Sequence, residues 1–343
     1  MTKFNIYWFK QYTSVLFFFY KYNKIYLGDK MKKCRVVFMG TPDFCVPVLL
    51  GLIENYNVIG VVTQPDKIVG RKKEIEFSPI KKVALENNIL VLQPEKVKVD
   101  YQSIVDLKPD IIVTCAYGQI IPKELLDYPK YGCINVHASL LPKLRGGAPI
   151  HRAIINGEKT TGITIMYMDV GMDSGDIITQ EEIEITSDMN VEVLHDKLSI
   201  IGRDLLLKTL PDILNNNIRR IKQDESLVTF AKIIKREDEI LDFNDTTENV
   251  YNKIRGLSPF PGSYSLLDGK IVKIYKARKE KNLTKRIPGD IVTIYKDGIG
   301  VKTLDGEIVI EELKLEGKKR VSAKDFLNGI NKDELLSKKF VKE

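Results

Sequence analysis

Short apolar runs that alternate with helix-like segments are the feature that most limits how this chain can fold. The first run, CRVVFM, leads into Gly40-Thr41-Pro42, which predicts a buried strand followed by a turn. Strands buried on both faces read as unbroken apolar runs, so the pattern predicts a parallel sheet with helices on both faces. The predicted strands are 34–39, 58–63, 89–92, 110–115 and 133–137, and the predicted helices among them are 46–52 and 79–88.

The sequence pattern changes from about Thr161 onward. Residues 162–168 and 180–185 are predicted strands, and the apolar positions of 191–210 have the spacing of an amphipathic helix that ends near Pro211. A polar, charged connector is expected next, over 219–240.

Asp-Gly pairs punctuate the last hundred residues. After a predicted helix at 248–256, alternating runs are separated by Asp268-Gly269, Asp297-Gly298 and Asp305-Gly306, which are typical of tight hairpins. Antiparallel strands joined in this way predict a small barrel.

These patterns predict an α/β fold class with two domains. A Rossmann-like, mostly parallel sheet domain is followed by a small C-terminal β-barrel that is OB-like. The length of 343 residues agrees, since a domain usually takes about 100–200 residues. The predicted boundaries are 1–30 for a leader or disordered extension, 31–218 for the first domain, 219–240 for the linker and 241–343 for the barrel domain.

Composition excludes several classes of protein. Hydrophobic residues make up 43% and charged residues 29%, which is ordinary for a globular chain and excludes a disordered, collagen-like or multi-span membrane protein. The cysteines have no CxxC spacing, so neither a disulfide scaffold nor a zinc ribbon is expected. This cysteine usage favours a reducing, cytoplasmic compartment. They are Cys34, Cys45, Cys115 and Cys133.

The net charge of +7 is concentrated at the two ends of the chain. Residues 1–30 and 235–343 each carry +4, whereas 31–234 carries −1. Basic ends favour a polyanionic partner, such as a nucleic acid or a membrane surface. A Lys-rich, solvated surface is the alternative that charge alone leaves open.

The first thirty residues are rich in aromatic side chains and are set apart from the fold. Their longest apolar run, 15–20, is too short to span a bilayer and is not followed by a small-residue cleavage site. A membrane-surface anchor, a flexible tail and translated leader sequence are the three interpretations. The leader or tail is favoured, because Met31-Lys32-Lys33 directly precedes the first strand.

Asn135, His137 and Asp173 are the candidate catalytic residues. Asn135 and His137 end an apolar strand, and the period of two places both side chains on one face. Asp173 lies in a Gly-rich loop, 171–175. Each has a structural alternative: a hydrogen-bonded buried histidine for His137, and a turn residue for Asp173. His151 and His195 lie in predicted helices and are interpreted as structural.

The sequence lacks the residues that several other kinds of chemistry require. One histidine among scattered acids does not make a metal site, so no metal is expected. The chain has neither a Gly-x-Ser-x-Gly elbow nor a GxGxxG fingerprint after its first strand. An Asn, His and Asp set without a nucleophile suits direct transfer, in which the substrate attacks and the enzyme stabilises an oxyanion and handles protons.

Several segments resemble the folate-dependent formyltransferases, and among them the members that act on methionyl-tRNA. The resemblance covers 31 to about 330. It is carried by VFMGTPDF at 37–44, TQPD at 63–66, AYGQ at 116–119, NVHASLLP at 135–142, GITIMYMDVGMDSGDII at 162–178, QDES at 223–226 and PFPG at 259–262.

The resemblance implies a reaction at these residues. The α-amine of methionine on initiator methionyl-tRNA would attack the formyl group of 10-formyltetrahydrofolate, giving N-formylmethionyl-tRNA for translation initiation. Asn135 and His137 would stabilise the oxyanion, and Asp173 would orient His137 and help to remove the amine proton. The residues implied to bind folate are Ser139, Leu140, Leu141, Pro142, Tyr117, Gly118, Gln119 and Asp169.

The resemblance also implies contacts with tRNA. A basic loop with Arg71, Lys72 and Lys73 would engage the acceptor end, although it lacks a glycine that the family commonly has between the Arg and the Lys pair. From charge alone this loop reads as a solvated loop. A basic strand in the barrel would follow the phosphate backbone. Its residues are Lys270, Lys273, Lys276, Arg278, Lys279 and Lys281.

Two other functions are weighed against this one. Formyl transfer to an amino sugar or a ribonucleotide would not need a basic barrel. An RNA-binding or folate-sensing protein of the same fold would not need the Asn, His and Asp set. The expected partners are therefore initiator methionyl-tRNA and a small folate, with a monomeric chain and no stable membrane partner.

Overall fold

A computed structural model describes residues 31–69, 74–282 and 284–342. The predicted leader at 1–30 and the basic-loop residues Arg71, Lys72 and Lys73 lie outside the described residues. The described chain forms two compact units. The first unit, within the described residues, comprises residues up to His137 together with Thr164–Thr179 and Ser199–Lys222, and the second comprises Ala138–Ile163, Gln180–Leu198 and the chain from Gln223 on.

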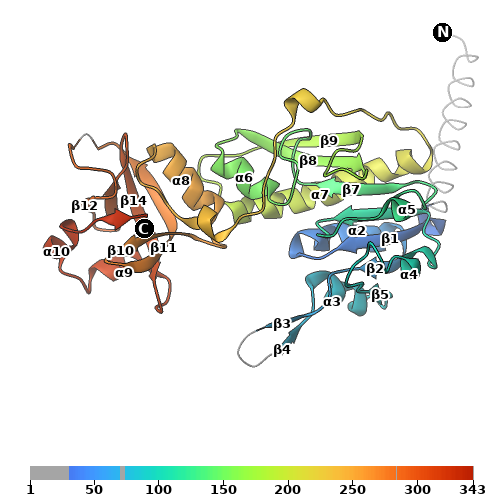
Figure 1. Cartoon of the computed structure of the whole chain (residues 1–343), viewed down its shortest axis with the longest axis horizontal. Coiled ribbons are helices and arrows are strands. Elements are labelled where there is room, and N and C mark those ends of the chain that lie inside the picture. The colour runs from blue at the N-terminus through green and yellow to red at the C-terminus, as the bar shows by residue number, and fades with distance from the viewer. Residues whose placement is uncertain (1–30, 70–73, 283, 343) are drawn as a thin grey trace, which may run out of the picture. The chain divides into compact units, whose positions relative to one another are not determined.

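A mostly parallel sheet organises the N-terminal half, as predicted (Figure 1). Its strand order is β5-β2-β1-β6-β7-β8-β9. The pairs from β5 to β7 are parallel, and β8 runs antiparallel to β7. The strands are β1 (Arg35–Gly40), β2 (Asn57–Val62), β5 (Val91–Leu92), β6 (Ile111–Cys115), β7 (Cys133–His137), β8 (Thr160–Tyr167) and β9 (Ile177–Glu184).

The apolar runs form strands because both faces of the sheet are covered. Val36 to Met39 in β1 and Ile111 to Val113 in β6 have no exposed surface. At about 25 cal/mol per Å² of buried apolar area, such strands supply much of the driving force for folding.

Helices follow most strands of the first sheet. The helix α3 is capped by the Ser78 side chain, which accepts from the amide of Lys81, and Pro79 occupies its first position. The last long helix passes through Pro211 and ends four residues later than predicted at 210. The elements are η1 (Asp43–Cys45), α2 (Val46–Asn55), α3 (Pro79–Glu86), α4 (Gln102–Val105), α5 (Lys123–Leu126), α6 (Pro149–Ile155) and α7 (Val191–Leu214).

A short hairpin that the strand analysis missed projects from the first unit (Figure 1). It consists of β3 (Lys67–Val69) and β4 (Glu74–Glu76), with Ile68 opposite Ile75 and Lys67 opposite Glu76. The predicted basic loop joins these two strands in the sequence.

The C-terminal part is an antiparallel half-barrel, which confirms the expected small barrel domain. Asp268 and Gly269 both have positive φ (52° and 73°), as the tightest hairpin turn requires. Its strand order is β12-β13-β14-β11-β10-β16, with β15 beside β14. The elements are α8 (Thr247–Gly256), β10 (Ser263–Leu267), β11 (Lys270–Glu280), β12 (Ile291–Ile294), β13 (Ile299–Lys302), β14 (Glu307–Leu315), β15 (Val321–Ser322), α9 (Ala323–Leu327), α10 (Lys332–Leu336) and β16 (Phe340–Val341).

The segment predicted as a polar, charged connector is mostly exposed, and it makes ordered backbone contacts. Two short helices, η2 (Glu225–Leu227) and η3 (Arg236–Glu239), lie in it. Ala231 is fully buried and exchanges two backbone hydrogen bonds with the loop at 145–148. The division into 31–218, 219–240 and 241–343 stays a prediction. In the described part of the chain, no helix combines the length and the apolar character needed to cross a membrane.

Candidate active site

The candidate catalytic residues lie at the carboxyl end of the central strands, where parallel sheets place their ligand sites. In the sheet register, Thr114 of β6 lies opposite Asn135 of β7, and Asn135 lies opposite Met166 of β8. His137 ends β7 and pairs with Thr164. Asn135 is half-buried, whereas His137 is only 6% exposed.

Thr114 fixes the amide of Asn135. Its hydroxyl donates to Oδ1 of Asn135 at 2.9 Å. The same hydroxyl lies 3.1 Å from the carbonyl oxygen of Ile134 and 3.1 Å from Sδ of Met168. Because Oδ1 accepts from Thr114, Nδ2 is the atom of Asn135 that can donate to a substrate. Thr114 is itself 2% exposed, so its hydroxyl is held in place by the core.

His137 and Asp173 form an ion pair across the site. Nδ1 of His137 lies 3.7 Å from Oδ1 of Asp173, and the Asp173 side chain is 19% exposed. The resemblance requires these two residues to be neighbours, although they are far apart in the sequence. A carboxylate at this distance restricts the orientation of the imidazole ring.

The Gly-rich loop places Asp173 by folding back on β8. A Cβ atom on Gly175 would lie 1.9 Å from the carbonyl oxygen of Tyr167, so only glycine fits there. The amide of Tyr167 donates to the carbonyl oxygen of Asp176 at 2.9 Å. Asp173 itself has φ of 47°, a left-handed conformation that Asp and Asn tolerate better than most residues. These contacts of the loop position the Asp173 carboxylate.

Three strand-end loops meet at the carbonyl oxygen of Tyr117. This oxygen accepts from Nε2 of Gln64 at 2.9 Å and from the hydroxyl of Thr41 at 3.3 Å. Gln119 Nε2 donates in turn to Oε1 of Gln64. Ala116 and Gly118 have positive φ (44° and 85°), which turns the 116–119 loop sharply over the sheet edge. Burial raises the pKa of Tyr117 to about 12, so its phenol stays protonated.

The second loop implied to bind folate lies near α5. The pKa of Lys123 is raised, first by its hydrogen bond to Asp127 and further by the charge of Asp169. Asp169 also accepts from the amide of Val170. Val170 and Met172 expose about two thirds of their side chains (64% and 65%), so this loop offers apolar surface to a ring.

The segment Ser139 to Pro142 begins the second unit. Ser139 has no exposed surface, and its hydroxyl donates to the carbonyl oxygen of Lys143 at 2.7 Å. The carbonyl oxygen of Leu141 accepts from Nε2 of Gln180. Side-chain and backbone bonds therefore hold this loop in shape.

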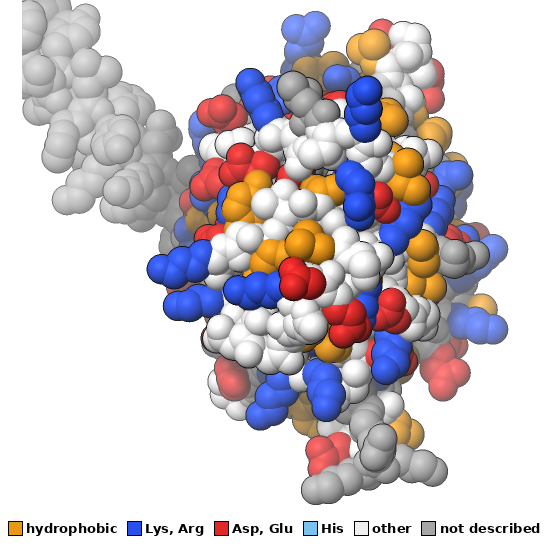
Figure 2. All heavy atoms as spheres, turned by 90° about the vertical axis from the view of Figure 1, so that its left-hand side faces the viewer, with side chains coloured by type: hydrophobic (Ala, Val, Ile, Leu, Met, Phe, Trp, Pro, Cys, Tyr) orange, Lys and Arg blue, Asp and Glu red, His pale blue; other side chains and the backbone are white. Residues whose placement is uncertain are grey.

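The basic strand β11 carries its cations next to acids. Carboxylates lie within ion-pair distance of Lys273, Lys276, Arg278 and Lys279. Lys270 and Lys281 are exposed at the two ends of this basic set. Figure 2 shows the same mixture on one face of the half-barrel, where blue, red and apolar side chains are interspersed. The pairs of Lys276 and Lys279 are the more exposed ones, and exposed pairs contribute only about 0–1 kcal/mol, whereas Lys273 and Arg278 and their acids are mostly buried.

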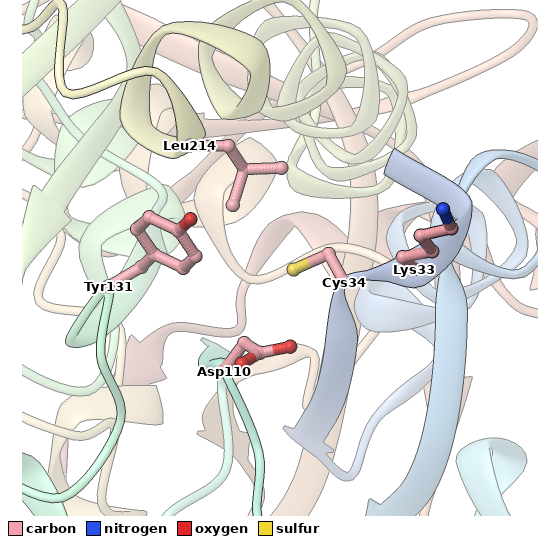
Figure 3. A pocket seen from close by; sticks show the side chains of 5 residues that line it. All are labelled: Lys33, Cys34, Asp110, Tyr131 and Leu214. Carbon is pink, nitrogen blue, oxygen red and sulfur yellow. The ribbon is translucent and has the colours of Figure 1, made fainter. Parts of the chain in front are cut away.

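A pocket of about 140 Å³ opens at the amino ends of the strands, opposite the ends that carry the candidate catalytic residues (Figure 3). Lys33 and Cys34 precede β1, and Asp110 and Tyr131 precede β6 and β7, so the pocket faces the amino ends of the strands. Asp110 accepts from the amide of Arg35. This edge is not where a parallel sheet places its ligand.

The sequence analysis missed Thr114 and Gln64 as site residues. A threonine inside the apolar run DIIVTC was the available signal for Thr114. Gln64 lies within TQPD, but its role depends on contacts that no local pattern contains.

Among the described residues, no three or more His, Cys, Asp and Glu side chains are grouped so as to hold a metal ion.

Comparison with known proteins gives matches along almost the whole described chain. Residues 32–210 match the formyl transferase family model, and 233–331 match the model of the formyl transferase C-terminal domain. Methionyl-tRNA formyltransferase from Bacillus subtilis is 53% identical over 299 residues, which cover 86% of this chain and 94% of that protein. The enzyme of the same name from Bacillus cytotoxicus is 54% identical over 299 residues, covering 86% of this chain and 95% of the relative.

Solved structures share the fold at low identity. An N-formyltransferase from Helicobacter canadensis, in complex with folinic acid and dTDP-3-aminofucose, has a TM-score of 0.62 at 21% identity, covering 81% of this chain and 98% of that one. HypX from Aquifex aeolicus in complex with tetrahydrofolic acid has a TM-score of 0.59 at 17% identity, covering 85% of this chain and 46% of that one.

Proposed function

This chain belongs to the formyl transferase family and, within it, to the methionyl-tRNA formyltransferases, and on this basis we propose how its residues carry out the reaction. The reaction transfers the formyl group of 10-formyltetrahydrofolate to the α-amine of methionine on initiator methionyl-tRNA. The product, N-formylmethionyl-tRNA, serves translation initiation and links one-carbon metabolism to protein synthesis.

Asn135 and His137 stabilise the negative charge that develops on the formyl oxygen. Bound 10-formyltetrahydrofolate supplies the formyl carbon. Nδ2 of Asn135 donates to its oxygen, because Thr114 holds Oδ1 on the other side of the amide. His137 donates as a cation, which strengthens the interaction in a site largely shielded from water.

Asp173 holds His137 in place and takes part in proton removal. Its Oδ1 faces Nδ1 of His137, and part of its side chain remains exposed to the site. The attacking amine must lose a proton as the new C–N bond forms, and a carboxylate next to the reacting centre is a suitable acceptor.

The folate site uses the two loops at the strand ends. Tyr117, Gly118 and Gln119 present backbone groups whose positions are fixed through Gln64. Asp169 and the exposed apolar residues Val170 and Met172 lie in the 169–172 loop, and the charge of Asp169 contributes to the raised pKa of Lys123 in α5. Backbone donors and acceptors together with exposed apolar surface fit a flat heterocycle with polar edges. Ser139, Leu140, Leu141 and Pro142 are further residues that we propose to contact folate.

Methionyl-tRNA binds through two basic segments. Arg71, Lys72 and Lys73 engage the acceptor end. A second set of cations on the basic strand binds the phosphate backbone, namely Lys270, Lys273, Lys276, Arg278, Lys279 and Lys281. Residues 31–218 thus serve catalysis, 219–240 link the parts and 241–343 bind tRNA. The enzyme acts as a cytoplasmic monomer.

The ion pair between His137 and Asp173, beside Asn135, is the observation that carries this mechanism. The test is a formylation assay with charged initiator tRNA and 10-formyltetrahydrofolate. His137→Ala should lower kcat by at least about 10²-fold while tRNA affinity stays close to normal. His195→Ala, on the exposed side of α7, is the matched control and should behave as wild type. Near-normal turnover of His137→Ala, or formylation of an amino sugar in place of methionyl-tRNA, would contradict the proposal.

A further inference from the structure

The segment that follows the catalytic strand β7 forms a closed turn. The hydroxyl of Ser139 donates to the carbonyl oxygen of Lys143 at 2.7 Å, and the amide of Lys143 donates to the carbonyl oxygen of Leu140 at 3.1 Å. One end of this turn continues from His137, the last residue of β7. The other end leads into residues 144–148. The position of the turn therefore depends on what holds 144–148.

Backbone hydrogen bonds join 144–148 to the connector. The amide of Arg145 donates to the carbonyl oxygen of Thr229 at 2.9 Å, and the amide of Ala231 donates to the carbonyl oxygen of Arg145 at 2.7 Å. Arg145 and Phe230 thus form a parallel bridge, the pairing of two strands that lie side by side. The connector supports the segment along its backbone.

Leu144 is held in a strained backbone conformation by the same contact. This buried leucine has φ of 59°, in the left-handed region that bulky residues rarely adopt. Its amide donates to the hydroxyl of Thr229 at 2.9 Å. Packing is also close at Gly147, where a Cβ atom would lie 2.7 Å from Cγ1 of Ile233. Strained residues persist only where their surroundings fix them, and they cluster at sites that hold ligands.

The side chain of Arg145 adds a fork of hydrogen bonds to the connector. Its buried guanidinium donates from Nε to Oε1 of Gln223 at 2.9 Å. Nη2 and Nη1 donate to the two carboxylate oxygens of Glu225, at 2.8 and 3.3 Å. A bidentate pair fixes the orientation of both partners, which a single hydrogen bond does not. The Glu225 side chain is 73% exposed, so it can be replaced without disturbing buried groups.

We propose that Arg145, held by Glu225, is a positioning residue that keeps 139–142 in the shape that binds 10-formyltetrahydrofolate. The inference rests on the proposed function, because that function makes 139–142 a folate contact. Each guanidinium nitrogen already donates to the connector, so Arg145 acts on folate through the segment it holds.

Loss of the pair should weaken folate binding more than any other step. Without the fork, the segment keeps its backbone bonds but adopts the binding shape for a smaller share of the time. The apparent dissociation constant of a ligand rises in inverse proportion to that share. At saturating folate the ligand restores the binding shape, so kcat changes little. The cations proposed to bind tRNA lie outside 139–148, so tRNA affinity should change little as well.

The experiment compares wild type with Glu225→Gln, Arg145→Gln and the double variant. The KM for 10-formyltetrahydrofolate, kcat and the dissociation constant of methionyl-tRNA are measured for each. The folate KM should rise about 3- to 10-fold in Glu225→Gln and about 10- to 100-fold in Arg145→Gln, as expected for hydrogen bonds between charged groups with one partner exposed. The double variant should exceed Arg145→Gln by less than about 2-fold, because either change breaks the same pair.

Glu237→Gln is the matched control, since Glu237 is another exposed connector carboxylate and pairs with Lys235. It should keep the wild-type constants. If Arg145→Gln does not fold, Glu225→Gln alone decides the outcome. An unchanged folate KM in Glu225→Gln, losses that multiply in the double variant, or an equal loss in tRNA affinity would overturn the inference alone. Failure of wild type to formylate methionyl-tRNA would overturn the proposed function and this inference with it.

Discussion

Replacing Asp173 by Asn removes one negative charge from the site and little else. Asn has almost the same shape and also tolerates the left-handed conformation that Asp173 adopts, with φ of 47°. Asp173→Ala would be a poorer test, because a left-handed alanine costs about 1–2 kcal/mol. Asp173→Asn should therefore keep the native fold, which a denaturant titration checks.

The size of the kinetic effect follows from the 3.7 Å between Nδ1 of His137 and Oδ1 of Asp173. Two unit charges at this distance attract each other by about 4 kcal/mol at an effective dielectric constant of about 20. This energy counts when His137 carries its charge beside the oxyanion. Since about 1.4 kcal/mol is a factor of ten, a loss of up to about 10³-fold in turnover is the expected ceiling, and 10²–10³-fold is the expected range.

The assay is single-turnover formylation of methionyl-tRNA with enzyme in excess, so that product release does not mask the chemical step. Asp176→Asn, in the same loop, is the matched control and should retain nearly full activity. A rate for Asp173→Asn within about 3-fold of wild type would show that the carboxylate charge has no catalytic role. An equal loss in both variants would point to loop structure instead of charge.

Three further predictions concern other parts of the chain. Thr114→Val should lower kcat by up to about 10-fold with little change in the KM for tRNA, since it removes one hydrogen bond that orients the Asn135 amide. Glu311→Gln should tighten tRNA binding about 2- to 5-fold and steepen its salt dependence, because this carboxylate pairs with two cations of the basic strand; filter-binding titrations at several salt concentrations measure both. Burial lowers the pKa of His151, so the unfolded chain binds this proton more readily and the free energy of unfolding should fall as pH drops below the unfolded pKa of about 6.5. His151→Gln should flatten that pH dependence in denaturant titrations between about pH 7.5 and 5.5.

Local patterns were sufficient for the main elements of the fold. Each apolar run predicted as a parallel strand overlaps a strand of the first sheet, because burial on both faces favours mostly apolar side chains in such a run. The Asp-Gly pair at 268–269 predicted its hairpin correctly, because both residues adopt the positive φ that a two-residue turn requires. The short elements β3, β4, β15 and β16 escaped notice, since two or three residues carry too little periodicity to be recognised.

The candidate site was only partly predictable. Period-two geometry was enough to pair Asn135 with His137. The approach of Asp173 depends on a loop that folds back at Gly175, which a sequence pattern does not contain. Thr114 and Gln64 act through contacts between strands that are neighbours in the sheet but distant in the chain.

Gln64 and Thr41 line a pocket of about 250 Å³ and also hold the carbonyl oxygen of Tyr117 through hydrogen bonds. Any ligand that displaced these two side chains from the pocket side would therefore also alter the support of the 116–119 loop, and the reverse holds as well. Linkage then requires that each ligand change the affinity of the other by the same factor.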